Sequence, residues 1–180
     1  GIEIEPAMIE RARARLAAHP QLKDRLIFHQ ADALTIELPR KFALVIIPYN
    51  TFMHFLTQDV QLALLKRIKG WLQPGGALAL DLPNAGEAFA TQDTEAIILE
   101  RTFLELESGH LVMQQSSSRL DRAEQLMDVT WLYDEIGDEG AVKRTVVPVQ
   151  IHYFFLSELS LLLEASGLQV EEAYGDFDGM

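Results

Sequence analysis

Polar residues end several apolar, strand-like runs, and their types suit a nucleotide-like ligand. Glu3 lies in "GIEIE", Asp32 ends "RLIFHQAD", and residues 48–50 end "FALVIIPYN". A carboxylate such as that of Glu3 offers paired acceptors for two ribose hydroxyls, and that of Asp32 can take a donor such as an adenine amino group. Open α/β sheets bind ligands at the carboxyl ends of their strands. We therefore predict a ligand site formed by these segments.

Each acid also has a structural alternative. An acid shortly before a proline and a helix often caps the helix or interacts with its dipole, which applies to Glu3 and more directly to Glu5, next to Pro6. Aspartate favours turns by bonding nearby backbone, so Asp32 alone also fits a loop. "QPGG" at 73–76 is a turn signal that we interpret as structural. The order and spacing of the segments together carry the ligand hypothesis.

The elements that would position these residues alternate along residues 1–84. The run "FALVIIPYN" is typical of a parallel strand buried on both faces. Helical spacing of apolar residues predicts helices over "AMIERARARLAAH" and "TQDVQLALLKRIKGWL". The alternation predicts an α/β fold with a Rossmann-like, open, mostly parallel sheet.

A different pattern begins near residue 97. Strand-like runs separated by short polar turns predict an antiparallel β-meander over residues 97–153, inserted in the α/β body or lying over it as a lid. A helix over "SELSLLLEASG" and one more strand over "LQVEEAYGDF" follow. No long linker divides the chain, so we expect residues 1–180 to form a single domain.

The composition of the chain limits the kinds of partner that it can bind. The net charge of −12 argues against nucleic-acid binding through phosphate neutralisation. The chain has no cysteine, which rules out disulfides and thiolate metal sites and fits a cytoplasmic protein; no metal-ligand set is predicted. The longest apolar runs are far too short to cross a bilayer. A small-molecule partner is the expected one, without nucleic acid or membrane.

Taken together, the segments resemble the class I S-adenosylmethionine-dependent methyltransferases, of the small-molecule type. "GIEIEPAMIERARARL" is similar to the family's segment after its glycine-rich loop, and "HQADAL" to its second acidic segment. "FALVIIPYNTFMHF" resembles the family's central strand and turn, and "LLKRIKGWLQPGGALALDLPN" its L-x-P-G-G-x-L-x-L segment. The resemblance covers residues 1–84 well and residues 151–179 more loosely.

The resemblance implies S-adenosyl-L-methionine as cofactor and assigns residues to it. Glu3 would bind the ribose, Asp32 would meet the adenine amino group, and residues 48–50 would lie beside the methionine part and the methyl group. The full implied set is Glu3, Ile4, Met8, Asp32, Ala33, Pro48, Tyr49 and Asn50.

The chain departs from the family pattern at two places. Ala43 stands where an acid often follows the phenylalanine of the central segment. The glycine-rich loop, expected upstream of Glu3, is absent from the sequence, and "PGG" at 74–76 precedes a strand and cannot replace it. We therefore expect residues 1–180 to be a methyltransferase-like domain that is incomplete at its N-terminus, and at its C-terminus too.

The implied reaction transfers a methyl group to an N, O or C atom of an unidentified acceptor, while the protein supplies alignment and desolvation. A general base is needed only if the acceptor must lose a proton; His54 and Tyr153 are candidates, with a helix start and a core position as their alternatives. Arg119, Trp131 and Tyr133 in the meander would line the acceptor pocket, or else make a sheet-to-sheet contact.

Two other functions remain open from the sequence. An NAD(P)-dependent Rossmann oxidoreductase also places an acid on a ribose at a strand end, although the "MIERAR" helix start and "LQPGG" favour the methyltransferase. The second is a non-catalytic methyltransferase-like domain in which the meander mediates assembly. A homodimer through the meander is a further expected partner arrangement.

Overall fold

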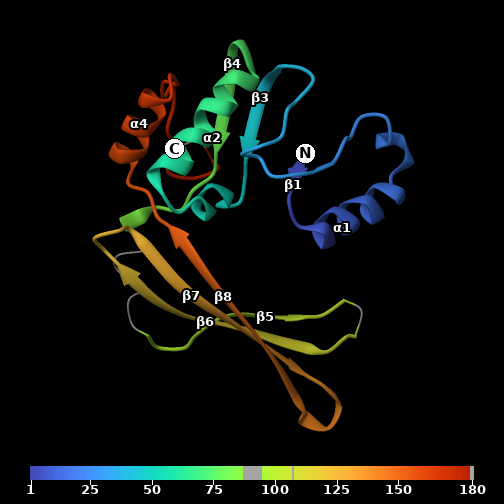
Figure 1. Ribbon diagram of the computed structural model, residues 1–180. Coiled ribbons are helices and arrows are strands. Elements are labelled where there is room, and N and C mark those ends of the chain that lie inside the picture. Colours follow the sequence, from blue (N-terminus) through green and yellow to red (C-terminus); the bar gives the residue numbers. More distant parts are fainter. Residues whose placement is uncertain (87–94, 107, 179–180) are drawn as a thin grey trace.

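The structure, a computed structural model, describes residues 1–86, 95–106 and 108–178. An α/β part lies on one side of a long antiparallel sheet (Figure 1). In chain order the elements are β1 (Ile2–Glu3), α1 (Pro6–Ala17), η1 (Pro20–Leu22), β2 (His29–Gln30), β3 (Phe42–Ile47), η2 (Thr51–His54), α2 (Gln58–Trp71), β4 (Leu72–Leu80), β5 (Ile98–Leu104), β6 (Leu111–Asp121), β7 (Leu126–Ile136), η3 (Asp138–Gly140), β8 (Val142–His152) and α4 (Leu156–Ala165), where η marks a short 3₁₀ helix.

The strands of the α/β part form two separate parallel pairs. β1 pairs with β2, matching Ile2 with His29, and β3 pairs with β4. The sequence predicted one open, mostly parallel sheet, and this is not confirmed: in the described residues the two pairs are distinct two-stranded sheets. Each strand of the first pair is only two residues long, so that pair rests on very few backbone hydrogen bonds.

The β3–β4 pair is covered on one face only. Side chains alternate between the two faces of a strand, and Val45 and Ile47 pack against the core while Leu44 and Ile46 are 50% and 59% exposed. Burial of β3 on both faces, as its unbroken apolar run predicted, is therefore wrong for the described chain. α2 contacts β4, and α4 packs against α2.

The "QPGG" stretch is a bulge inside β4 and does not precede the strand. Phe42 is matched with Leu72, but Leu44 is matched with Ala77, so the register shifts across residues 73–76. Gly75 has a φ of +74°, and a Cβ on Gly76 would lie 3.0 Å from the carbonyl oxygen of Phe42. The two glycines let the bulge form against the neighbouring backbone.

The antiparallel meander is present as a four-stranded sheet of order β5-β6-β7-β8. Its register matches Ser116 with Trp131 on β7, and Trp131 in turn with Val147 on β8. The final strand predicted over residues 168–177 is not formed, because α4 ends at Ala165 and no strand follows it among the described residues.

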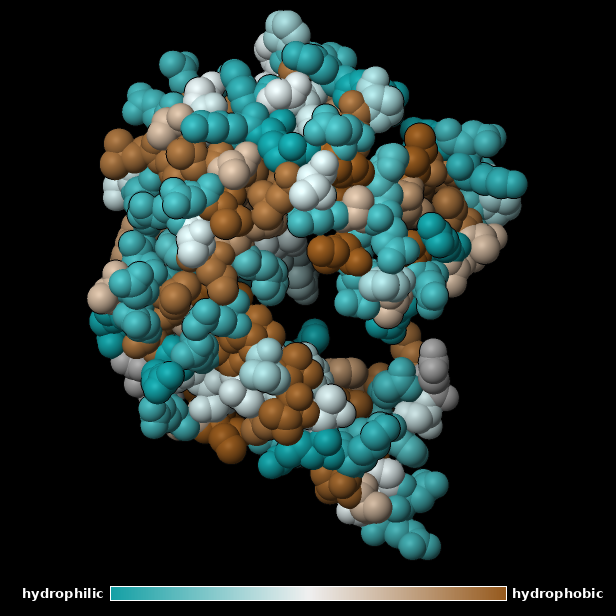
Figure 2. All heavy atoms as spheres, viewed as in Figure 1, coloured by the Kyte–Doolittle hydropathy of each residue, from teal (hydrophilic) through white to brown (hydrophobic). Residues whose placement is uncertain are grey.

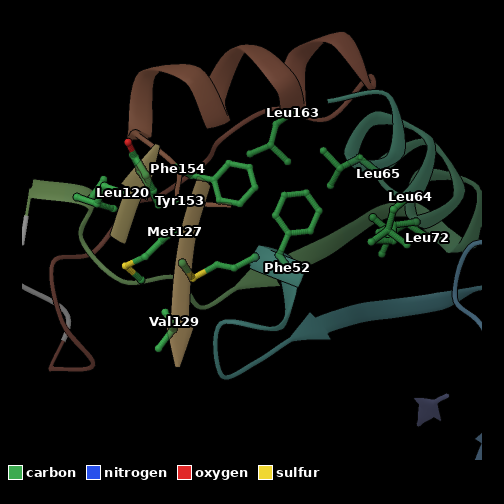
Figure 3. Packing of buried hydrophobic residues seen from close by; sticks show 13 residues of the cluster. Phe52, Leu64, Leu65, Leu72, Leu120, Met127, Val129, Tyr153, Phe154 and Leu163 are labelled. Atoms are coloured by element: carbon green, nitrogen blue, oxygen red, sulfur yellow. The ribbon is translucent and has the colours of Figure 1, made fainter. Parts of the chain in front are cut away.

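The hydrophobic core joins the two parts of the molecule. Phe52 of η2 is fully buried and stacks on Phe154, just after β8, with ring centroids 5.1 Å apart. Leu65 of α2 and Leu163 of α4 point toward the same two rings (Figure 3), and Met127 of β7 adds the antiparallel sheet to this buried cluster. The core therefore holds the segment after β3 and the end of β8 in one arrangement.

Replacing Phe52 by alanine should lower the free energy of unfolding by about 3–5 kcal/mol, because a fully buried aromatic side chain leaves a cavity. Urea denaturation of the variant measures this loss. Phe177, which is 91% exposed, provides the control: its alanine variant should unfold like the wild type. Equal losses for the two variants would contradict the packing described above.

Candidate functional site

The two acids at the start of the chain, Glu3 and Glu5, make different contacts. Glu5 is the N-cap of α1, and its Oε1 accepts a hydrogen bond from the Ala7 amide at 3.5 Å, which confirms its role at the helix start. Glu3 ends β1 and is half-buried, and its Oε1 accepts from the Glu5 amide at 2.9 Å. The second contact fixes the carboxylate of Glu3 at the carboxyl end of β1.

Asp32 is the second residue after the neighbouring strand β2 and forms a tight turn. Its Oδ1 accepts from the Leu34 amide at 2.8 Å, and its carbonyl oxygen accepts from the amides of Thr35 and Ile36. The Ala31 amide donates to the carbonyl oxygen of Glu3 at 3.0 Å, so the β1–β2 pairing brings the two acidic segments side by side. The turn predicted as the alternative for Asp32 is thus present, and it sits where the ligand hypothesis placed the residue.

The segment after β3 adopts a strained conformation. Tyr49 and Asn50 both have left-handed backbone, with φ of 58° and 60°, which is rare for a bulky residue such as tyrosine. Asp81, at the end of β4, holds this turn: its Oδ2 accepts from the Tyr49 amide at 3.0 Å and its carbonyl oxygen from the Asn50 amide at 3.2 Å. Strained backbone of this kind gathers at functional sites.

Sequence reasoning missed Asp81, although the signal was available. It is the first polar residue after the run "ALAL", just as the "PYN" turn follows "FALVII".

Apolar side chains lie open beside these polar groups. Ile4 and Met8, predicted to pack near an adenine ring, are 65% and 51% exposed, and Tyr49 is 87% exposed. The surface is hollowed between the part that carries β1 and α1 and the antiparallel sheet (Figure 2). Exposed apolar groups of this kind suit a planar, largely apolar ligand ring.

The two candidate bases differ in their surroundings. His54 is exposed at the end of η2, a few residues beyond the strained turn. Tyr153 is 1% exposed, and its carbonyl oxygen accepts from Gln125 Nε2 at 3.3 Å. The burial of Tyr153 matches its core alternative, whereas His54 is accessible to a ligand.

The three residues predicted to line an acceptor pocket do not share one face of the antiparallel sheet. The register matches Trp131 with Ser116 and Tyr133 with Gln114, which places both aromatic rings on the same face. Arg119 is matched with Asp128 on the opposite face, and its Nη2 donates to Asp128 Oδ2 at 3.1 Å. The structure therefore brings Trp131 and Tyr133 together and leaves Arg119 apart.

Polar groups accompany the two aromatic residues on their face. Ser116 donates to Glu100, which stands at a bulge of β5, and Arg101 Nε donates to Gln114 Oε1 at 2.7 Å. Ser116 and Gln114 are 4% and 7% exposed. Sequence reasoning missed these four residues, because only the strand register shows that they lie beside Trp131.

The described residues also bear on metal binding and on membrane insertion. No group of three or more His, Cys, Asp or Glu side chains there could hold a metal ion. Within the same residues, no helix is long and apolar enough to cross a membrane.

Comparisons with known proteins point to one family. Residues 1–76 match the model of the methyltransferase domain family. A trans-aconitate 2-methyltransferase of Methylobacterium radiotolerans is 39% identical over 84 residues, which are 47% of this chain and 28% of that protein. Both of these matches are to methyltransferases, and each covers less than half of the chain.

Solved methyltransferases share the fold over nearly the whole chain. CcbJ of Streptomyces caelestis has a TM-score of 0.80 at 23% identity and covers 99% of this chain and 67% of its own. CalS10 of Micromonospora echinaspora, an amino pentose methyltransferase solved with SAM bound, has a TM-score of 0.73 at 21% identity, with 99% and 69% covered. The chain thus spans 28% of the curated relative and about two thirds of these solved proteins.

Replacing Tyr49 by glycine should raise the free energy of unfolding by about 0.5–1 kcal/mol, because glycine adopts left-handed backbone without the cost that tyrosine bears. Chemical denaturation measures the change. The control is Tyr174→Gly, at an exposed tyrosine outside the left-handed set, which should not gain stability. An equal loss of stability in both variants would contradict strain at the turn.

A buried histidine next to Tyr153 should make stability depend on pH. His152 is 3% exposed, and its Nδ1 has no hydrogen-bond partner among the described residues. Burial lowers the pKa of His152 below its ordinary value of 6.5, and the negative charge of Glu158 opposes this shift. Since the unfolded chain takes up the proton first, the folded state is fully favoured above pH 6.5 and loses stability below it.

The free energy of unfolding should therefore fall as the pH is lowered below about 6.5, and His152→Phe should remove part of this slope. Denaturation series at several pH values measure it. Replacing the exposed His19 by glutamine is the control and should leave the slope in place. Asp128, Asp134 and Glu135 also have lowered pKa values, mainly through side-chain hydrogen bonds, but they act at lower pH. A slope unchanged in the His152 variant would contradict this account.

Proposed function

We propose that the full-length protein is an S-adenosylmethionine-dependent methyltransferase acting on a small-molecule acceptor. The observation that carries the proposal is the placing of Glu3, the Asp32 turn and the Tyr49–Asn50 turn at the carboxyl ends of parallel strands. In Figure 1 the strands β3 and β4 run toward the antiparallel sheet, so ligands bound at these ends would lie between the two parts of the molecule.

The residues present fit this cofactor by their chemistry. The carboxylate of Glu3 offers acceptors for ribose hydroxyls, and the Asp32 turn presents carbonyl and carboxylate oxygens to an adenine amino group. Ile4 and Met8 supply exposed apolar surface for the ring. When bound, the cofactor supplies an electrophilic methyl group, and the protein's part is to hold the acceptor atom in line with it and to exclude water.

The face of the antiparallel sheet that carries Trp131 and Tyr133 is the proposed acceptor surface. Aromatic rings bind the apolar face of a small ring. The buried Ser116 and Gln114, bonded to Glu100 and Arg101, support this face of the sheet. His54, exposed after the strained turn, is the proposed general base if the acceptor loses a proton. Tyr153 is not proposed for this role, because it is buried in the core.

The exposed face of the β3–β4 pair points to a larger sheet in the full-length protein. In the full-length protein we expect further chain to cover the exposed face of β3–β4 and to give one open, mostly parallel sheet. The open face is apolar: it carries Leu44 and Ile46 of β3 and the matched Ala77 and Ala79 of β4. Contiguous apolar surface of this kind marks a contact with other chain.

Titration of the full-length protein with S-adenosylhomocysteine and, separately, with NAD and NADP tests the cofactor. We expect binding of the first and no binding of the other two. Glu3→Ala should weaken the binding about tenfold or more, because charged hydrogen bonds to the ribose are lost. The matched control Glu5→Ala should lower stability by about 1 kcal/mol through the lost cap and leave affinity unchanged. Binding of a dinucleotide alone would overturn the proposal.

The acceptor class can be tested with two compounds that the relatives suggest. The net charge of −12 disfavours anionic acceptors, so an amino sugar should be methylated in preference to trans-aconitate. With an accepted compound, Trp131→Ala should raise KM about tenfold and leave S-adenosylhomocysteine affinity unchanged. Arg119→Ala, on the opposite face of the sheet, is the control and should leave KM unchanged. Equal effects of both variants would contradict the assignment of the acceptor face.

A further inference from the structure

Arg67 of α2 contacts the Asp32 turn, although the two are far apart along the chain. Its Nε donates to the carbonyl oxygen of Ala33 at 3.2 Å, and its Nη2 donates to the carbonyl oxygen of Ile36. Nη2 also lies 3.3 Å from Glu37 Oε1. One guanidinium group therefore holds three points of the segment 33–37, which is 30 to 34 residues away along the chain.

The surroundings of Arg67 hold its side chain in place. Its guanidinium lies over the ring of Trp71, one turn further along α2, at 5.5 Å from the ring centroid. The Arg67 side chain is 26% exposed, whereas that of Glu37 is 89% exposed. An exposed ion pair contributes little, so the bonds to the two carbonyl oxygens are the contacts that matter. Arginine suits them because its planar fork donates to two acceptors at once.

The position of Arg67 links the two halves of the proposed cofactor site. The Asp32 turn follows β2, whereas α2 follows the Tyr49–Asn50 turn and η2. In the described residues the β1–β2 and β3–β4 pairs share no backbone pairing. Arg67 therefore connects the Asp32 turn, proposed to bind adenine, to α2, the helix that follows the Tyr49–Asn50 turn proposed to lie beside the methyl group.

We propose that Arg67 is a positioning residue for adenine recognition: by fixing the segment 33–37 against α2, it orients the Asp32 turn toward the adenine amino group. This inference rests on the proposed function, since it assigns the Asp32 turn to adenine. Arg67 itself does not contact the ligand.

The test uses the full-length protein and two ligands, S-adenosylhomocysteine and S-inosylhomocysteine, which differ at the amino group of the base. The wild type should prefer the adenosyl compound. Arg67→Ala should weaken S-adenosylhomocysteine binding about tenfold and reduce this preference, because two charge-assisted hydrogen bonds are lost. Arg67→Lys keeps the charge but not the fork, and should give an intermediate loss. Lys66→Ala, at the exposed neighbouring position, is the matched control and should change neither value.

The outcomes separate the two proposals. If the wild type binds S-adenosylhomocysteine and the Arg67 variants keep both its affinity and the preference between the two ligands, Arg67 is only structural and the inference is overturned. A lowered melting temperature with unchanged affinities overturns it as well. If Arg67→Ala does not fold, Arg67→Lys decides in the same way. A wild type that binds neither ligand overturns the proposed function, and this inference with it.

Discussion

The contact between Phe52 and Phe154 is the constraint on which the arrangement of this molecule depends. Phe52 follows the strained turn after β3, and Phe154 follows the last strand of the antiparallel sheet, so their stacking fixes these two segments relative to each other. Leu65 and Leu163 bring α2 and α4 to the same rings. A methyl-transfer site between the α/β part and the antiparallel sheet requires such a fixed relation, because a small misplacement of reacting groups costs much of the rate.

Around this core, each part of the proposed site is held by its own hydrogen bonds. Glu3 is fixed by the amide of Glu5, the Asp32 turn closes on itself, and Asp81 holds the left-handed turn at Tyr49. These hydrogen bonds do not join the β1–β2 pair to the β3–β4 pair. Arg67 makes such a longer-range contact, because it extends from α2 to the Asp32 turn. Short-range contacts shape the pieces of the site, and longer-range contacts set their relative positions.

The sequence predicted the helices and strands better than it predicted which parts of the chain pack against them. Apolar spacing predicted α2 and the apolar run predicted β3, because periodicity is a local property. The placement of Glu5 at the helix start also followed from its neighbour Pro6. What covers β3 is not a local property, and its exposed Leu44 and Ile46 contradict the expected burial on both faces. Likewise, Trp131 and Tyr133 share a face by their spacing, but the separation of Arg119 depends on the β6–β7 register, which no local pattern gives.

We propose that the carboxyl ends of the parallel strands form one cofactor site that faces the antiparallel sheet. A crystal structure of the full-length protein with S-adenosylhomocysteine tests it most directly. The ribose should lie on Glu3, the adenine beside the Asp32 turn, and the sulfur beside residues 48–50, with Trp131 on the far side of the hollow. A ligand bound elsewhere, or one that contacts neither Glu3 nor the Asp32 turn, would contradict it.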